Sequence, residues 1–255
     1  MDIETSKAHG ILTIEFNRVE KKNAITSAMY QIMADALKDG EGDPAVRAIL
    51  ISGKPEIFTA GNDLDDFLRN PPPAGSDRPV TQFMRALSSA SKPVVAAVSG
   101  AAIGIGTTML MHCDLVYAAD NAKFSMPFTQ LGLCPEFASS MLLPQLVGNQ
   151  RAAEKLLLGE PFSAQEALQM GFVSKVVPAS DLPAFAQAQA AKLVALPASS
   201  LRATKRLMKG DQAAAITARM QEENKHFGEM LGAPEAKEAF TAFFEKRKPD
   251  FTKFS

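Results

Sequence analysis

Along the first half of the chain, segments in which apolar residues recur with the period of a strand alternate with segments in which they recur with the period of a helix. Between His9 and Phe16 the two kinds of side chain alternate, which is the pattern of a half-buried strand. Thr26 then stands where it can cap a helix that ends at Gly40 and Gly42 and carries apolar residues on one face. Those apolar residues are Met29, Ile32, Met33 and Leu37. The same pattern predicts strands over 46–52, 93–98 and 114–118, helices over 64–68, 80–90 and 107–112, and a break at Pro71–Pro73. Strands that alternate with helices pair in parallel, so we predict an α/β core.

From Ala138 onward the pattern becomes almost wholly helical. Helices are predicted over 139–147, 151–158, 181–196 and 199–209, two more follow Asp211, and Ser163 with Glu166 forms a capping-box pattern. The junction at Leu196-Pro197 is a natural boundary, although no flexible linker follows it. We therefore predict a core over residues 1–197 and a helical subdomain over residues 198–255.

Composition narrows the class of protein. The chain has 255 residues, of which 46% are apolar and 22% charged, and its formal net charge is -1. This balance gives no global electrostatic attraction to nucleic acid or to an anionic membrane. The longest apolar stretch, Pro93 to Leu110, is interrupted by Ser99 and by glycines, so it suits a buried strand, a turn and a helix better than a membrane span. Cys113 and Cys134 are far apart, and the first ten residues contain no apolar run. We expect a cytoplasmic protein with reduced thiols and with no nucleic-acid or membrane partner.

The first segment that could carry chemistry is Ala60-Gly61-Asn62-Asp63-Leu64, a turn between a strand and a helix. A glycine turn at a helix start exposes peptide N–H groups, which can hold a developing negative charge. A purely structural interpretation is also open, in which Gly61 makes a tight turn and Asp63 caps the helix.

The second segment is the glycine-rich stretch from Ser99 to Thr108, again between a strand and a helix. Gly104-Ile105-Gly106 lacks the third glycine of a dinucleotide-binding fingerprint, because Met109 stands in its place. The stretch therefore fits either an anion-holding turn or close packing between a helix and a strand through small residues.

The third segment centres on Glu136, which follows Pro135. An acid at this position can simply offset the dipole of the helix after it. Its apolar neighbours Leu133, Phe137 and Met141 would also raise the pKa of a carboxyl held among them, which makes Glu136 a candidate general acid/base. The histidines are scattered and complete no catalytic triad or HExxH pattern, and His112 fits a hydrogen-bonded core position.

In this order, the three segments resemble the crotonase (enoyl-CoA hydratase/isomerase) superfamily. Further matching elements are Asn17-Arg18, Lys21-Lys22-Asn23-Ala24-Ile25, Cys113–Ala118, Ala122-Lys123-Phe124 and the closing run Phe243–Lys248. The resemblance implies a ββα spiral core with a C-terminal helical trimerisation subdomain. It also implies a homotrimer or hexamer and a reaction that needs no metal and no redox cofactor, since coenzyme A is part of the substrate.

The resemblance also assigns site residues. The peptide N–H groups of Asn62 and Ile105 correspond to the family's oxyanion hole, which binds the thioester oxygen through main-chain atoms. The CoA-contacting positions are Lys22, Ala24, Ala60, Gly61, Asn62, Asp63, Leu64, Phe227 and Lys246. The last two lie in the C-terminal helices and would reach the CoA of a neighbouring subunit. The Glu245-Lys-Arg-Lys248 run is equally typical of a solvated helix end.

The carboxylates that are present favour one reaction. Thr108 and Phe128 occupy the positions of the two glutamates with which the family's hydratases add water. Glu136 instead resembles the base of the 3,2-enoyl-CoA isomerases, most of all the peroxisomal type. We therefore predict an isomerase that moves the double bond of a 3-enoyl-CoA to the 2-trans position through a dienolate. Another CoA-thioester reaction, residual hydration and a non-catalytic acyl-CoA-binding protein remain open as alternatives.

Overall fold

The computed structural model of the chain describes residues 1–69, 77–210 and 212–254. Its strands are β1 (Ile3–Ala8), β2 (Ile11–Phe16), β3 (Ala48–Ser52), β4 (Ile57–Thr59), β5 (Val94–Val98), β6 (Ala101–Ile103), β7 (Leu115–Ala119), β8 (Lys123–Ser125), β9 (Phe162–Ser163) and β10 (Lys175–Val177). Its α-helices are α1 (Ser27–Gly42), α2 (Leu64–Arg69), α3 (Pro79–Ser88), α4 (Ile105–Thr108), α5 (Ser139–Val147), α6 (Asn149–Ala153), α7 (Ala164–Gln169), α8 (Leu182–Ala195), α9 (Ala198–Lys209), α10 (Gln212–Leu231) and α11 (Pro234–Phe244). The predicted break at Pro71–Pro73 lies outside the described residues.

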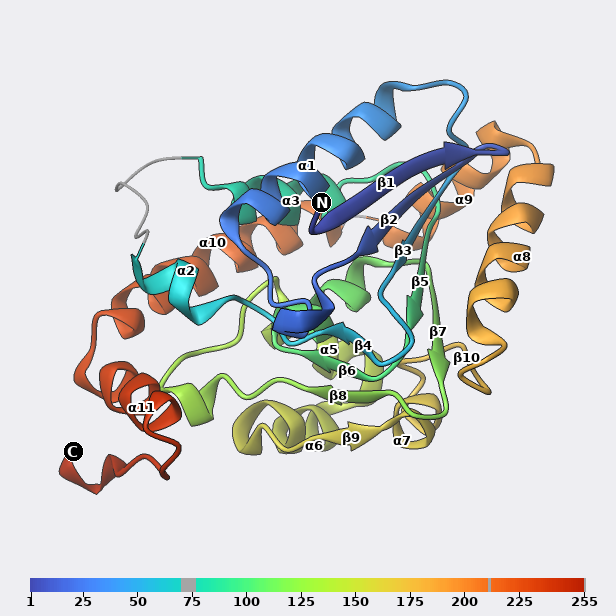
Figure 1. Cartoon of the computed structure of the whole chain (residues 1–255). Coiled ribbons are helices and arrows are strands. Elements are labelled where there is room, and N and C mark those ends of the chain that lie inside the picture. Colours follow the sequence, from blue (N-terminus) through green and yellow to red (C-terminus); the bar gives the residue numbers. More distant parts are fainter. Residues whose placement is uncertain (70–76, 211, 255) are drawn as a thin grey trace.

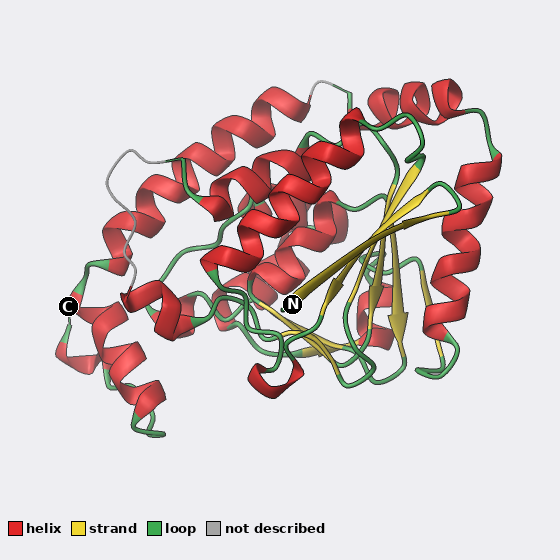
Figure 2. Cartoon of the chain, turned by 45° about the horizontal axis from the view of Figure 1, so that its top comes forward, coloured by secondary structure: helices red, strands yellow, loops and turns green. Residues whose placement is uncertain are grey.

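The larger sheet has the strand order β1-β2-β3-β5-β7-β10. Its pairs are parallel except for the antiparallel hairpin of β1 and β2. Side chains of β5 alternate between two cores, because Val94, Ala96 and Val98 face the main core whereas Val95 and Ala97 face the core under α8. Helix α8 covers one face of this sheet, and α1 and α3 lie on the other side (Figures 1 and 2). The predicted α/β core is confirmed.

The smaller sheet, with the order β4-β6-β8-β9, positions the candidate site. Strands β4 and β6 are parallel neighbours, so the turns that follow them leave the same edge of the sheet. These two turns are the segments around Gly61 and Gly104. The sequence-distant glycine segments are therefore adjacent in space.

The C-terminal helices pack on the same core as the strands. Ile216 and Met220 of α10 and Phe240 of α11 belong to the main hydrophobic cluster, together with residues of β3 and β5. Lys205 of α9 forms an ion pair of 2.6 Å with Asp114, just before β7. The domain boundary at residue 197 stays a prediction.

Five short strands were not predicted from the apolar pattern, and one of them, β8, has only three residues. β1 lacks an apolar pattern because only Ile3 is buried in it, and β6 is hidden inside the glycine-rich stretch. β9 and β10 interrupt the part of the chain that the sequence predicts to be helical. The predicted caps are present, since Thr26 accepts a hydrogen bond from the Met29 N–H and Ser163 accepts one from the Glu166 N–H. Within the described part of the chain, no helix is long and apolar enough to cross a membrane.

Candidate active site

Two glycine turns present adjacent peptide N–H groups at the edge of the smaller sheet. Gly61 has φ 87° and Gly104 has φ 56°, both in the region that favours glycine. Ile25 fixes the first turn, because its N–H donates to the Gly61 carbonyl at 2.8 Å and its carbonyl accepts from the Asp63 N–H at 2.9 Å. The N–H groups of Asn62 and Ile105 donate to no other described residue. They are therefore free to bind an oxygen that gains negative charge.

Gly61→Ala tests the first turn. An added Cβ would lie 2.8 Å from the backbone carbonyl oxygen of Ile103 at a positive φ, so the turn has to shift. We expect the variant to lose about 2 kcal/mol of unfolding free energy, as measured by urea denaturation. It should also lose most of its turnover of a 3-enoyl-CoA, the substrate predicted from the sequence. Gly42→Ala is the matched control, since nothing lies within 4 Å of its added Cβ. Equal behaviour of the two variants would contradict the role of this turn.

Glu136 lies in a strained loop, not in the first turn of a helix. The interpretation as a helix-dipole acid is wrong, because α5 begins at Ser139 and the two intervening residues, Phe137 and Ala138, have left-handed φ values of 58° and 57°. His112 contacts this loop through its Nε2, which is 2.8 Å from the Phe137 carbonyl oxygen. His112 is a buried, hydrogen-bonded core residue, as predicted.

The surroundings of Glu136 favour proton transfer. Its side chain is only 5% exposed, and its Oε1 is buried without a hydrogen-bond partner. Burial and then the nearby charge of Glu223 raise the pKa of Glu136 to about 8. A carboxyl with this pKa can both remove and return a proton near neutral pH.

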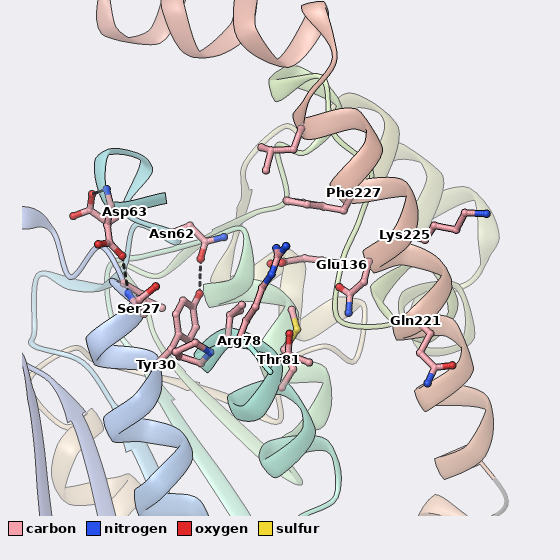
Figure 3. Close-up of a pocket in the computed structure, with 18 residues that line it drawn as sticks. Ser27, Tyr30, Asn62, Asp63, Arg78, Thr81, Glu136, Gln221, Lys225 and Phe227 are labelled. Atoms are coloured by element: carbon pink, nitrogen blue, oxygen red, sulfur yellow. Dashed lines mark hydrogen bonds between the residues drawn. The ribbon is translucent and has the colours of Figure 1, made fainter. Parts of the chain in front are cut away.

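The carboxyl of Glu136 opens into a cavity of about 390 Å³. Figure 3 shows Glu136 between Asn62 on one side and α10, which carries Gln221, Lys225 and Phe227, on the other. Tyr30 lies below Asn62 and donates a hydrogen bond of 2.5 Å from its hydroxyl to the Asn62 Oδ1 (Figure 3). Burial and the charge of Glu136 raise the pKa of Tyr30 well above its usual value, so its hydroxyl stays protonated as a donor.

A second cavity of about 580 Å³ adjoins the first, and Asn62, Asp63 and Phe227 line both. It brings together most of the residues predicted to contact CoA: Lys22, Ala24, Ala60, Gly61, Asn62, Asp63 and Leu64. Phe227, which was predicted to reach the CoA of a neighbouring subunit, lines the cavities of its own chain. Ile105 also lines the second cavity. Lys246 is exposed and lines neither cavity. The Asn62 turn therefore lies where the two cavities meet, and the Ile105 turn lines the larger one.

The other acids in the lining have different partners. Asp63 pairs with Arg18 at 2.7 Å and also accepts from the Asp66 N–H, so its predicted capping role holds. The Asp66 carboxylate accepts from the Ser27 N–H. Thr108 and Phe128 are buried and carry no carboxyl. In the described part of the chain, Glu136 is the buried carboxyl that keeps an oxygen without a partner.

Two residues of this site escaped sequence reasoning, namely Tyr30 and Glu223. Tyr30 has the signal of an ordinary core residue on the apolar face of α1. Glu223 could have been found, because Ile216, Met220, Glu223 and Phe227 follow the spacing of one helix face. An acid within an otherwise apolar stripe indicates a buried carboxylate with partners. Among the described residues, no group of three His, Cys, Asp or Glu side chains is placed to hold a metal ion.

Comparisons with known proteins identify the family. The family model for enoyl-CoA hydratase/isomerase matches residues 6–253. Over 251 residues, 95% of each chain, the sequence is 33% identical to the 1,2-epoxyphenylacetyl-CoA isomerase of Escherichia coli K12. It is 36% identical to the enoyl-CoA delta isomerase 2 of Rattus norvegicus, of which it covers 56% while 84% of this chain is matched.

A solved structure gives the same answer. The enoyl-CoA hydratase/isomerase from Pseudoalteromonas atlantica T6c superposes with a TM-score of 0.95 at 41% identity, covering 99% of this chain and 100% of that one. The chain belongs to the enoyl-CoA hydratase/isomerase family, whose members act on CoA thioesters. Hydratase names are as common as isomerase names among the relatives, so the reaction has to be argued from the site.

Proposed function

We propose that this protein is a 3,2-enoyl-CoA isomerase that uses Glu136 as its only acid/base. The observation that carries the proposal is the partnerless carboxyl oxygen of Glu136, buried in a cavity beside the Asn62 turn. A hydratase needs acid/base groups that deliver both a water and a proton across the double bond. Thr108 and Phe128, at the corresponding positions, have no group with a suitable pKa.

The reaction follows from the chemistry of the substrate. In a 3-enoyl thioester, both the carbonyl and the neighbouring double bond acidify the protons at C2. Glu136 in its ionised form removes one of them, and the electron pair moves through the double bond into a dienolate whose charge collects on the thioester oxygen. The Asn62 and Ile105 N–H groups bind this oxygen, each contributing about 3 kcal/mol to the transition state. The same carboxyl then returns the proton at C4, which leaves the double bond between C2 and C3.

The arrangement of the cavities supports this placement of the substrate. The CoA portion is expected in the larger cavity beside Lys22 and Leu64, and the acyl chain in the smaller one beside Glu136. The thioester then falls at their shared wall, next to Asn62. The homotrimer or hexamer, the reach of Lys246 to a neighbouring subunit and the cytoplasmic location remain predictions.

A pair of substrates tests the proposal. Purified protein is incubated with 3-hexenoyl-CoA and separately with 2-hexenoyl-CoA, while the absorbance of the conjugated thioester is followed and products are identified by mass. We expect conjugation of the first substrate without a gain in mass, and no addition of water to the second. Hydration of 2-hexenoyl-CoA would contradict the interpretation of Thr108 and Phe128. Turnover of neither substrate would favour another thioester reaction or an acyl-CoA-binding protein.

A further inference from the structure

Glu223 is a buried carboxylate for which proton transfer at Glu136 supplies no role. It lies on α10, is 5% exposed and accepts hydrogen bonds on both oxygens. Its Oε2 accepts from the Ala138 N–H at 2.6 Å, and its Oε1 accepts from the N–H and the hydroxyl of Ser140 at 3.0 and 2.5 Å. A carboxylate with this many donors is held in one position.

We propose that Glu223 is a positioning residue for the Glu136 base: its carboxylate binds the loop after Glu136 and fixes the direction in which that carboxyl enters the acyl cavity. This inference rests on the isomerase function proposed above for its kinetic test, although its spectroscopic test does not need that function.

The first argument is the strain of the loop. Phe137 and Ala138 are two consecutive left-handed residues, and neither is a glycine, so their Cβ atoms make this backbone conformation strained. Such a conformation persists only where the surrounding structure holds it. The peptide unit between these residues is held at both ends, because His112 Nε2 binds its carbonyl oxygen and Glu223 binds its N–H. Burial lowers the pKa of His112 to about 4, so this imidazole is neutral and Nε2–H can donate.

The second argument is the direction in which the loop is held. Ser139 donates from its hydroxyl to the Glu136 carbonyl oxygen at 2.6 Å, so the backbone of Glu136 is fixed from the helix side. Because Glu223 binds the next peptide, the backbone is held on both sides of the Glu136 carbonyl, and this fixes the direction in which the Glu136 side chain leaves the loop. A displacement of about 1 Å at a proton-transfer group can cost about 100-fold in rate.

The third argument is charge. Glu223 raises the pKa of Glu136, and burial raises the pKa of Glu223 itself against the effect of its three donors. The titratable groups near the pair include Tyr30 on α1, Cys134 before Glu136, and Arg219 one turn earlier on α10. Arg78, just before α3, and Lys225 of α10 line the same cavity as Glu136 (Figure 3), and His112 contacts the loop after it. A glutamine at 223 keeps the side-chain volume but removes the charge. The amide NH₂ of this glutamine would face the N–H of either Ala138 or Ser140, so the hydrogen bond to that N–H is lost.

Glu223→Gln is therefore the decisive variant. We expect kcat for 3-hexenoyl-CoA to fall about 10- to 100-fold, with KM changed far less, and the acid limb of kcat/KM to move to lower pH. Glu223→Asp retains the charge, so its acid limb should stay near that of the wild type even if kcat falls. Glu222→Gln is the matched control, because this neighbouring side chain is 58% exposed and makes its ion pair with Arg219. It should change neither quantity.

A structural role alone would leave the pH profile in place. If Glu223→Gln lowers stability but leaves kcat and the acid limb unchanged, or if Glu222→Gln shifts the limb equally, the proposal is wrong. Should Glu223→Gln fail to fold, Ser140→Ala removes one hydrogen bond to Oε1 and keeps the charge. That variant should lower kcat without moving the acid limb, and an unchanged kcat would overturn the proposal.

A measurement on the free protein separates this inference from the proposed function. The carboxyl of Glu136 is titrated by infrared difference between the wild type and Glu136→Gln, in the presence and absence of the Glu223→Gln change. We expect a midpoint of about 8 with Glu223 and a lower one with glutamine. If the wild type does not convert 3-hexenoyl-CoA, the proposed function fails while this titration still decides the role of Glu223.

Discussion

Replacing Glu136 with glutamine is expected to lower kcat for 3-enoyl-CoA isomerisation by about 10²- to 10⁴-fold. The substitution keeps the volume of the side chain and removes its ability to take a proton from C2. Because the cavity walls and the two oxyanion turns are unchanged, KM should change by much less. The measurement is the initial rate of conjugated-thioester formation from 3-hexenoyl-CoA across a range of substrate concentrations.

The control for this experiment is again Glu222→Gln, which removes a carboxylate that is exposed on α10. It should retain the wild-type rate. Equal turnover by the Glu136→Gln variant and the wild type would sink both the isomerase proposal and the assignment of the base. A variant that loses turnover but still exchanges the C2 protons with solvent would place the first proton transfer on another group.

The sequence predicts the fold wherever the apolar pattern is dense. Strands such as β3 and β5 are buried on both faces, and their near-continuous apolar runs make them visible. β1 is invisible because it lies at the edge of its sheet with one buried residue. β6 has three residues between glycine-containing segments, and its place is set by pairing with β4 and β8 rather than by its own sequence.

The candidate site is predictable where backbone geometry demands a residue type. Gly61 and Gly104 stand at positive φ, and this requirement is readable from the sequence. The partners of Glu136 are not readable in the same way. Ala138 and Glu223 are 85 positions apart, and only the packing of α10 against α5 brings them to 2.6 Å. The left-handed conformation of Phe137 and Ala138 is equally hidden, because neither residue type favours it.

The site combines two groups whose demands oppose each other. The Glu136 carboxyl needs burial to become a useful base, and Glu223 needs its charge to bind two peptide N–H groups. Because both carboxyls lie in one low-dielectric region, the ionisation of each depends on the charge of the other. At neutral pH the geometry favours charge on Glu223, which has donors on both oxygens, and a proton on Glu136, which has a partnerless oxygen. Burial of these two carboxyls therefore lowers the stability of the fold and brings the pKa of the proposed base, Glu136, to about 8.

The raised pKa of Glu136 predicts how the stability of the fold depends on pH. In the unfolded chain Glu136 ionises around its ordinary pKa of 4.5, whereas in the fold its pKa is about 8. Between these values the native state binds more protons than the unfolded state, so the contribution of Glu136 to stability is lost as pH rises from about 4.5 to about 8. The Glu136→Gln variant has no proton to lose. We compare the unfolding free energy of the variant with that of the wild type at each pH. The difference in favour of the variant should be larger at pH 9 than at pH 5 by roughly 2–5 kcal/mol.

Urea unfolding of both proteins at the two pH values measures the contribution of Glu136 together with its coupling to Glu223 and Tyr30, because the remaining titrating groups are common to both. Glu222→Gln should show a difference near zero, since that carboxylate is exposed on the surface of α10. A variant that gains no stability at high pH would mean that Glu136 ionises in the fold at its ordinary pKa. The burial argument for Glu136 as a base would then fail, even if its replacement abolished turnover.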